Sequence, residues 1–186
     1  MQTTRPITTI ATNAGDGGPL RTRIELVARI VRTAIGAMSR IPHSLIALLA
    51  RFAIAAVFWK SGQTKIEGLA IDLVGGEFQL GWPHLADSAV ALFRDEYKLP
   101  LLSPEWAATL AATGEHLLPI FVLLGLGTRF AALGLLGMTA VIQLLVYPGA
   151  WPTHGLWAAV LLWLMAQGPG RVSVDHWIAS RSGASA

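Results

Sequence analysis

The sequence of 186 residues contains no cysteine and few charged residues. Without cysteine it forms no disulfide framework, thiolate metal site, iron–sulfur cluster or covalently attached haem. Charged residues make up 13% of the chain, about half of the share in soluble domains, and hydrophobic residues make up 53%. Because so few charges cannot cover so much apolar surface in water, the composition predicts a membrane protein. The strongest alternative is a soluble helical bundle with very apolar helices.

The sequence also lacks the short motifs that carry self-contained chemistry. It has no glycine-rich nucleotide-binding motif and no G-x-S-x-G nucleophile motif. Its basic residues are too few for a nucleic-acid partner. A haem held by two histidines is not expected either, because His116 has no histidine partner at the same depth. Any redox chemistry would need a borrowed cofactor, and whether the chain is an enzyme stays open.

Four apolar segments are long enough, or nearly long enough, to cross a bilayer, which takes about 20 residues in a helix. We therefore predict an all-α membrane protein with a four-transmembrane-helix bundle in residues 41–178. The two ends of the chain are predicted to be tails. The N-terminal tail is predicted to be disordered and lacks the apolar core of a signal peptide. The predicted spans cover residues 41–61, 106–126, 129–147 and 153–168, and the predicted tails cover residues 1–20 and 179–186.

Residues 21–40 space their apolar side chains as an amphipathic helix does. A basic helix of this kind is typical of a membrane interface, although it could instead pack on the protein's own cytoplasmic end. Basic residues concentrate before the first span, and seven of the eleven acidic residues fall in the loop 62–105. The positive-inside rule then places both termini in the cytoplasm.

The outer loop, residues 62–105, is too long for a bare connection and is predicted to be structured. Residues 71–80 are typical of a hairpin with a Gly-Gly turn, in which Ile71 lies opposite Leu80 and Leu73 lies opposite Phe78. Residues 85–97 space their apolar side chains as one face of a helix. We expect this helix to cap the outer surface.

Two charged residues lie near the middle of predicted spans, Arg51 in the first and Glu115 in the second. Because these spans run antiparallel, both side chains are expected at the bilayer midplane, where burying either charge alone costs several kcal/mol. We therefore predict an ion pair between Arg51 and Glu115 inside the bundle. The pair could belong to a functional site, or it could only hold the two helices in register.

Other polar residues could line a pocket around this pair. His116 points about 100° away from Glu115 around the helix, toward another helix or a bound ligand. Residues near the outer face could edge the pocket mouth, or they could simply bond interfacial water. The candidates for the polar pocket are Arg51, Glu115, His116, Gln143, Lys60 and His154. As metal ligands, His84 and His154 are weak candidates, because no close-spaced ligand motif exists.

A set of short motifs runs through residues 45–178. It comprises Leu92–Tyr97 (LFRDEY) with Leu99-Pro100, Glu115, Gly125–Arg129 (GLGTR), Val141–Gln143 (VIQ) with Tyr147-Pro148, Trp151–His154 (WPTH) and Gly168–Gly170 (GPG). As a set, these motifs resemble the DoxX family of small four-span bacterial membrane proteins. The resemblance implies a four-helix bundle in the bacterial inner membrane. Members of that family are linked to quinone-coupled oxidation and to membrane oxidoreductase complexes, and others are accessories without settled chemistry.

Three functions are compatible with these features. The first is an accessory subunit of a redox system that binds a quinone in a polar midplane pocket formed by Arg51, Glu115 and His116. The second is a non-catalytic scaffold or assembly partner. The third is a protein that handles a small solute or a metal ion. The expected partners are the lipid bilayer and other membrane subunits, and a homo-oligomer is possible.

Overall fold

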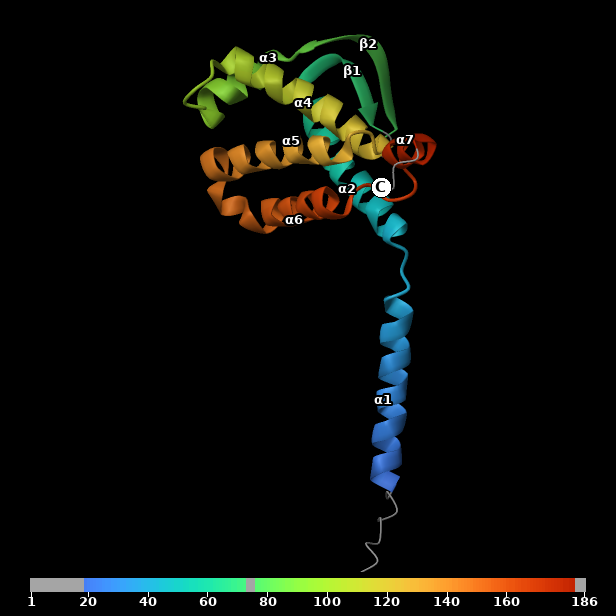
Figure 1. Ribbon diagram of the computed structural model, residues 1–186. Coiled ribbons are helices and arrows are strands. Elements are labelled where there is room, and N and C mark those ends of the chain that lie inside the picture. The colour runs from blue at the N-terminus through green and yellow to red at the C-terminus, as the bar shows by residue number, and fades with distance from the viewer. Residues whose placement is uncertain (1–18, 73–75, 183–186) are drawn as a thin grey trace, which may run out of the picture. The chain divides into compact units, whose positions relative to one another are not determined.

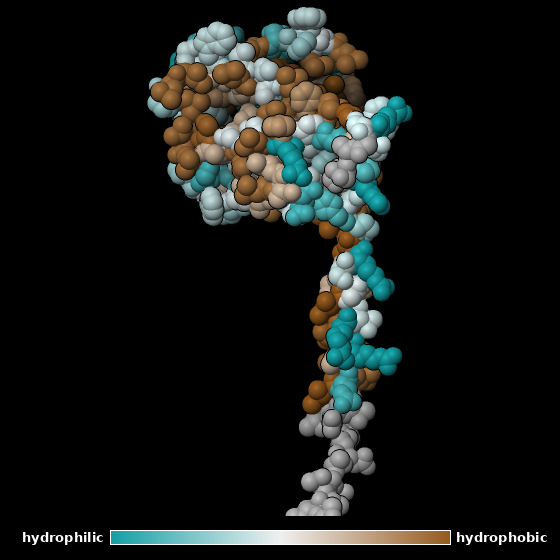
Figure 2. All heavy atoms as spheres, in the orientation of Figure 1, coloured by the Kyte–Doolittle hydropathy of each residue, from teal (hydrophilic) through white to brown (hydrophobic). Residues whose placement is uncertain are grey.

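The computed structural model describes residues 19–72 and 76–182 and divides the chain into two units, which are taken separately. The first unit, residues 1–41, contains helix α1 (Pro19–Met38). Along α1, apolar residues line one side and polar residues the other, as Figure 2 shows. The apolar side carries exposed side chains such as Ile24, Val27 and Ile35. Most of the predicted N-terminal tail lies outside the described residues.

The second unit, residues 42–186, is built around four long helices (Figure 1). Helix α2 packs on α4, α4 on α5, α5 on α6, and α6 in turn on α2. Their shared core consists of side chains from all four helices, namely Ile54, Phe58, Val122, Ala131, Ala132, Leu135, Leu161 and Leu164. The bounds are α2 His43–Gln63, α4 Pro104–Leu124, α5 Thr128–Val141 and α6 Trp151–Gln167.

Three helices among the described residues are long and apolar enough to cross a membrane. They are α2, α4 and the stretch Thr128–Val146, in which α5 continues into the short π-helix η2 (Ile142–Val146). Many of their large apolar side chains are exposed, and Figure 2 shows apolar residues over most of the visible face of this unit. The protein is therefore a helical membrane protein. Helix α6 is shorter, with 17 residues, so a fourth span stays a prediction.

The turn between α4 and α5 depends on two glycines in left-handed conformations. Gly125 ends α4 at φ 71°, and Gly127 precedes α5 at φ 54°. Only glycine adopts such angles without a steric penalty, so the chain reverses within three residues. At the other end, Pro104 occupies the first turn of α4, where its missing N–H is not needed.

The segment between α2 and α4 contains a two-stranded antiparallel sheet and a short helical part. Strands β1 (Ile66–Asp72) and β2 (Glu77–Leu85) are followed by α3 (Asp87–Leu92) and the π-helix η1 (Phe93–Tyr97). The predicted register was wrong by two residues, because Ile71 pairs with Phe78 rather than with Leu80. The pairing that the structure describes ends at Asp72 and Glu77. Leu73 lies outside the described residues.

The C-terminal segment folds back onto the ends of the long helices. Pro148–Ala150 (η3) joins η2 to α6, and α7 (Val174–Ser182) follows α6. Helix α7 reaches into residues 179–182, which were predicted to belong to a tail. The backbone N–H of Asp175 donates to the carbonyl of Gly125 at 2.8 Å, which ties the start of α7 to the α4–α5 turn.

Candidate functional site

The intramembrane charges form two separate polar clusters. The prediction that Arg51 pairs with Glu115 was wrong, because Glu115 contacts Lys65 and Arg51 contacts backbone carbonyls. The reason is the stagger of the antiparallel helices. Arg51 lies level with the C-terminal end of α4, whereas Glu115 lies beside Gly62, one residue from the end of α2. Eleven residues of α2 separate the two levels, which is about 16 Å along a helix axis.

Glu115 and Lys65 form a buried ion pair. The Nζ of Lys65 lies 2.7 Å from Oε2 of Glu115, and the two side chains are 5% and 3% exposed. The same ammonium donates to Oγ of Ser61 at 3.1 Å and to the carbonyl of Ser61 at 3.3 Å. The ammonium thus has two hydrogen-bond acceptors on Ser61 and an ion-pair contact with Glu115. Lys65 lies two residues after the end of α2, in the segment that was predicted to be a structured outer loop.

His116 connects α4 to α2 and to the hairpin. Its Nδ1 lies 2.7 Å from the carbonyl of Ala112, which accepts only from a protonated nitrogen. Its Nε2 is then the acceptor for the amide of Gln63 at 2.9 Å, and the Gln63 carbonyl accepts from the N–H of Ile71 at 2.7 Å. Both ring nitrogens are thus occupied within the protein. Of the two expected roles, these contacts favour the interhelical one.

Trp59 adds a second link between α2 and the hairpin. Its indole N–H donates to the carbonyl of Ile71 at 3.0 Å, and its ring packs edge-on against His116 at 5.1 Å between centroids. A methyl group on Gly62 would come within 2.9 Å of the His116 ring, so α2 and α4 touch here. The hairpin is therefore held against the two helices at the level of His116, close to the middle of α4.

Arg51 belongs to the second cluster, at the C-terminal end of α4. Its Nη1 donates to the carbonyl of Leu123 at 3.3 Å, and its Nη2 donates to the carbonyl of Val172. The side chain is 1% exposed. A helix end leaves carbonyls without intrahelical partners, and a guanidinium with five donors can satisfy several of them. These contacts give Arg51 a structural role that joins α2, α4 and the C-terminal segment.

Asp175 completes this cluster by capping α5. Its carboxylate accepts from the backbone N–H groups of Gly127 at 2.7 Å and Thr128 at 3.0 Å, and from the Thr128 hydroxyl at 2.9 Å. The N-terminus of a helix presents unpaired N–H groups and a partial positive charge, both of which favour a carboxylate. Asp175 was not among the predicted residues. An acid shortly after the last apolar segment is a weak signal for it.

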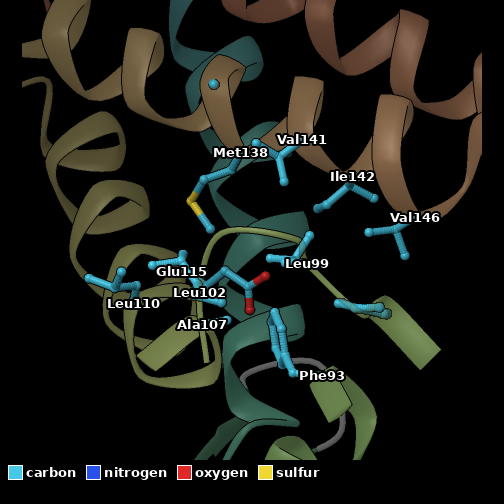
Figure 3. A pocket seen from close by; sticks show the side chains of 13 residues that line it. Phe93, Leu99, Leu102, Ala107, Leu110, Glu115, Met138, Val141, Ile142 and Val146 are labelled. Atoms are coloured by element: carbon cyan, nitrogen blue, oxygen red, sulfur yellow. The ribbon is translucent and has the colours of Figure 1, made fainter. Parts of the chain in front are cut away.

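An apolar cavity of about 310 Å³ opens beside Glu115. Figure 3 shows the carboxylate of Glu115 pointing into it, near Phe93 and Leu99. The walls come from α4, α5 and η2, and from η1 with the residues that follow it. The lining residues are Phe93, Tyr97, Leu99, Leu102, Ala107, Leu110, Ala111, Glu115, Gly137, Met138, Val141, Ile142 and Val146. Glu115 is the charged residue of this lining.

Tyr97, which lines the cavity, belongs to a group of two tyrosines and a glutamate. The hydroxyl of Tyr147 donates to the carboxylate of Glu96, and the rings of Tyr97 and Tyr147 meet edge-to-face at 5.7 Å. This hydrogen bond raises the pKa of Tyr147 well above its usual value, and burial raises the pKa of Tyr97. Both phenols therefore remain neutral donors at physiological pH. They join η1 to the end of η2.

The remaining predicted pocket residues lie away from the Glu115 cavity. Nδ1 of His154 lies 2.8 Å from the side-chain carbonyl of Gln143, whose amide donates to the carbonyl of Pro148 at 2.7 Å. These contacts brace the connection between η2 and α6. Lys60 is exposed on α2. His84 lies 3.6 Å from a carboxylate oxygen of Glu67, with both side chains exposed.

His84 and His154, the two metal candidates, lie in different contacts and do not form a three-ligand site. Within the described part of the chain, no three histidine or acidic side chains converge closely enough to hold a metal ion. The residue that the predicted pocket lacked is Lys65, whose burial depends on the hairpin and on α4 rather than on neighbouring residues in the sequence. Glu115 is the predicted residue that lines the cavity.

The comparisons with known proteins bear on this arrangement. A family model described as DoxX matches residues 46–148, which is more than half of the chain. This range contains all but the first three residues of α2, the sheet, α4 and α5, and with them Glu115, Lys65 and the whole cavity lining. The comparison with curated proteins and the comparison with solved structures gave no match. The expected resemblance is thus confirmed: the chain belongs to the DoxX family.

Proposed function

We propose that the protein is an integral membrane accessory subunit of a redox system and that it binds the ring of a quinone in the Glu115 cavity. The observation that carries the proposal is a charged, buried ion pair at one end of an otherwise apolar cavity. Small-molecule sites combine apolar walls with a few converging polar groups, and their volumes start at about 300 Å³. A quinone ring has this character, since it is flat and apolar with oxygens at its ends.

The polar contacts available to such a ligand differ from those predicted. Arg51 and His116 are occupied by carbonyls and by Gln63, so they are left out of the proposed site. Glu115 would accept a hydrogen bond from a ring hydroxyl of the reduced form, the quinol, and Lys65 holds the carboxylate in place. A bound quinone would supply two-electron chemistry coupled to protons. The role of Glu115 is then to bind and orient the quinol hydroxyl.

A route from the lipid supports a membrane-soluble ligand. Several residues that line the cavity are also exposed, among them Leu110 (55%), Leu102 (45%) and Val141 (42%). These side chains belong to the apolar surface of α4, α5 and the segment before α4. A hydrophobic ligand that is dissolved in the bilayer can therefore reach Glu115 between α4 and η2 without crossing water.

The proposed setting follows from the charge distribution. We infer that α6 is a fourth span, that the protein lies in the bacterial inner membrane, and that both termini face the cytoplasm. Helix α1 then lies in the membrane interface with Arg29 and Arg32 toward the lipid headgroups. The clustering of basic residues before α2 and of acidic residues between α2 and α4 supports this orientation.

The proposal is tested by filling the cavity without disturbing the ion pair. Gly137 lines the cavity, and a Cβ added to it meets no atom within 4 Å. Gly137→Leu should therefore fold normally and weaken the binding of a short-chain quinone by about tenfold or more, which corresponds to about 1.4 kcal/mol. Binding is measured by quenching of tryptophan fluorescence in lipid nanodiscs, and quinone that co-purifies is quantified after extraction.

The matched control is Gly36→Leu on α1. A Cβ on Gly36 also meets no atom within 4 Å, and the residue lies far along the sequence from the cavity residues. We expect this variant to bind the probe as the wild type does. Equal binding by wild type and Gly137→Leu, or the absence of quinone from the purified wild type together with no binding of added quinone, overturns the proposal.

A further inference from the structure

Strand β2 exposes a row of large apolar side chains. Phe78, Leu80 and Trp82 occupy alternate positions along the strand and are 64%, 83% and 89% exposed. Successive side chains of a strand point to opposite faces, so these three share one face. In the part of the chain that the structure describes, β2 pairs only with β1, and its other edge is unpaired. The strand thus offers both an apolar row and a free edge.

Strand β2 belongs to a hairpin that is held against the long helices. Phe78 pairs with Ile71, and Ile71 is bonded to Trp59 and Gln63 of α2, beside His116 of α4. Figure 1 shows β1 and β2 running alongside α4, and both strands line a hollow shared with α4. An exposed strand edge presents unpaired backbone N–H and carbonyl groups, which are a template for pairing with another strand. The free edge of β2 is therefore available to a partner strand.

The side chains of β2 are complementary to those of a second β2 strand. When two copies pair antiparallel about Leu80, Leu80 lies opposite Leu80, and Phe78 lies opposite Trp82 of the other copy. Aromatic and aliphatic cross-strand pairs of this kind stabilise antiparallel sheets. Gln79 then faces Gly81, and Glu77 faces Pro83, so no like charges meet. Proline on this strand is tolerated near the end of the paired segment.

We propose that two copies of this chain pair through β2 about a two-fold axis at Leu80, forming a four-stranded antiparallel sheet. The pairing satisfies the free backbone groups of this edge, and it places the two apolar rows side by side on one face of the sheet. A two-fold interface of this kind uses the same patch on both subunits, as in most homodimers. The proposal does not depend on the identity of any ligand in the Glu115 cavity.

The absence of cysteine from the chain allows a clean cross-linking test. In native membranes, Leu80→Cys should give a disulfide-linked dimer for most of the protein, because directly opposed Cβ atoms lie about 4.5–5.5 Å apart. Glu77→Cys is the matched control on the same exposed strand. Its two copies would be six residues out of register, about 20 Å apart, which is too far for a disulfide.

A mixed experiment fixes the register. Copies with Phe78→Cys and copies with Trp82→Cys, carrying different tags, should cross-link to each other and not to themselves. A further variant, Leu80→Lys, places a charge at the edge and should leave a folded monomer in nanodiscs. Resistance of each cysteine variant to extraction from the membrane, and its elution as a single species in detergent, confirm that the protein is inserted and folded.

Three outcomes overturn the proposal. The first is a Leu80→Cys protein that stays monomeric under oxidation while a spin label at the same position reports lipid contact, which means that lipid covers the strand. The second is a cross-link to a partner of a different mass, which assigns the edge to another protein. The third is equal cross-linking of Leu80→Cys and Glu77→Cys, which indicates random collision.

Discussion

At the scale of single residues, the buried charges are neutralised by two different chemistries. Glu115 contacts an ammonium, whereas Arg51 contacts only carbonyl oxygens among the described partners. An ion pair in low dielectric leaves a net neutral unit, and a guanidinium against carbonyls keeps its charge in contact with dipoles. The pair of Glu115 and Lys65 can therefore be replaced by apolar residues together, but not one residue at a time.

Removing one partner of this pair should destabilise the protein strongly. Glu115→Leu leaves the ammonium of Lys65 buried with only Ser61 as a partner and is expected to cost about 3–5 kcal/mol. The double variant Lys65→Met/Glu115→Leu removes both charges and should recover most of this loss. The free energy of unfolding is measured by denaturant titration in detergent micelles.

The same variants separate stability from ligand binding. If Glu115 binds the ligand, the double variant is stable and binds quinone more weakly than the wild type. A double variant that is as unstable as Glu115→Leu contradicts the buried pair. A double variant that is stable and binds quinone fully contradicts the role of Glu115 in the proposed site while leaving the ion pair intact.

The sequence allows both buried charges to be predicted, but not their partners. Arg51 and Glu115 stand out because charged residues are rare inside apolar segments. Because they lie at similar positions along two predicted spans of equal length, they were expected at equal depth in the membrane. The stagger of α2 against α4 depends on how the helices pack, which the sequence pattern does not contain. Lys65 could not be predicted, because it follows α2 and becomes buried only when the hairpin folds back over α4.

At the scale of elements, the α4–α5 turn depends on a residue from a distant part of the chain. Asp175 at the start of α7 binds the first N–H groups of α5, and its own N–H binds the end of α4. Gly125 leaves room for the guanidinium of Arg51 beside this turn, since a Cβ at position 125 would lie 2.2 Å from Nη1 of Arg51. The turn, Arg51 and α7 therefore form one packed unit.

Loss of the cap should weaken this unit measurably. Asp175→Ala removes all three hydrogen bonds to Gly127 and Thr128 and is expected to cost about 1–2 kcal/mol of unfolding free energy. Asp175→Asn keeps an acceptor oxygen and should lose less. Hydrogen exchange of the first turn of α5 is measured alongside stability. Unchanged exchange in Asp175→Ala contradicts the assigned cap.

The hairpin shows which part of an element can be predicted from sequence. Alternating apolar residues and glycines indicated a hairpin within the outer loop, and a strand pair is present there. The register was wrong because the glycine pair was taken as a two-residue turn, whereas the strands begin to pair at Asp72 and Glu77. Side chains alternate between the two faces of a strand, so a shift of two residues leaves each side chain on the same face. The apolar face of the hairpin was therefore still predicted correctly.

At the scale of the whole molecule, composition and apolar segment length led to the correct class. Three helices long enough to span a membrane coincide with predicted spans, and the family assignment agrees with them. The predicted midplane pocket could not be located from sequence, since its position depends on which helices touch and at what height. Phe93 and Tyr97 line the cavity, although the motif that contains them had entered only through the family resemblance.

The number of spans is tested by labelling single cysteines in a chain that has none of its own. Thr33→Cys and Ser180→Cys should react from the cytoplasmic side, and Asp95→Cys from the outer side, because four spans return the chain to its starting side. Each position is exposed. Intact cells and inverted vesicles are treated with a charged maleimide. Labelling of Ser180→Cys from the outer side contradicts the crossing of α6.

The contacts of Arg51 set an order on how the chain enters the membrane. Its carbonyl partners lie 72 and 121 residues further along the sequence, on Leu123 and Val172. A ribosome therefore releases α2, with its guanidinium, long before either partner exists. During that interval the charge must remain near water or lipid headgroups, so α2 cannot settle at its final depth. Helix α2 can therefore reach its final depth only after the last one-tenth of the protein has been made. A chain that stops after α6 would leave Arg51 without the carbonyl of Val172.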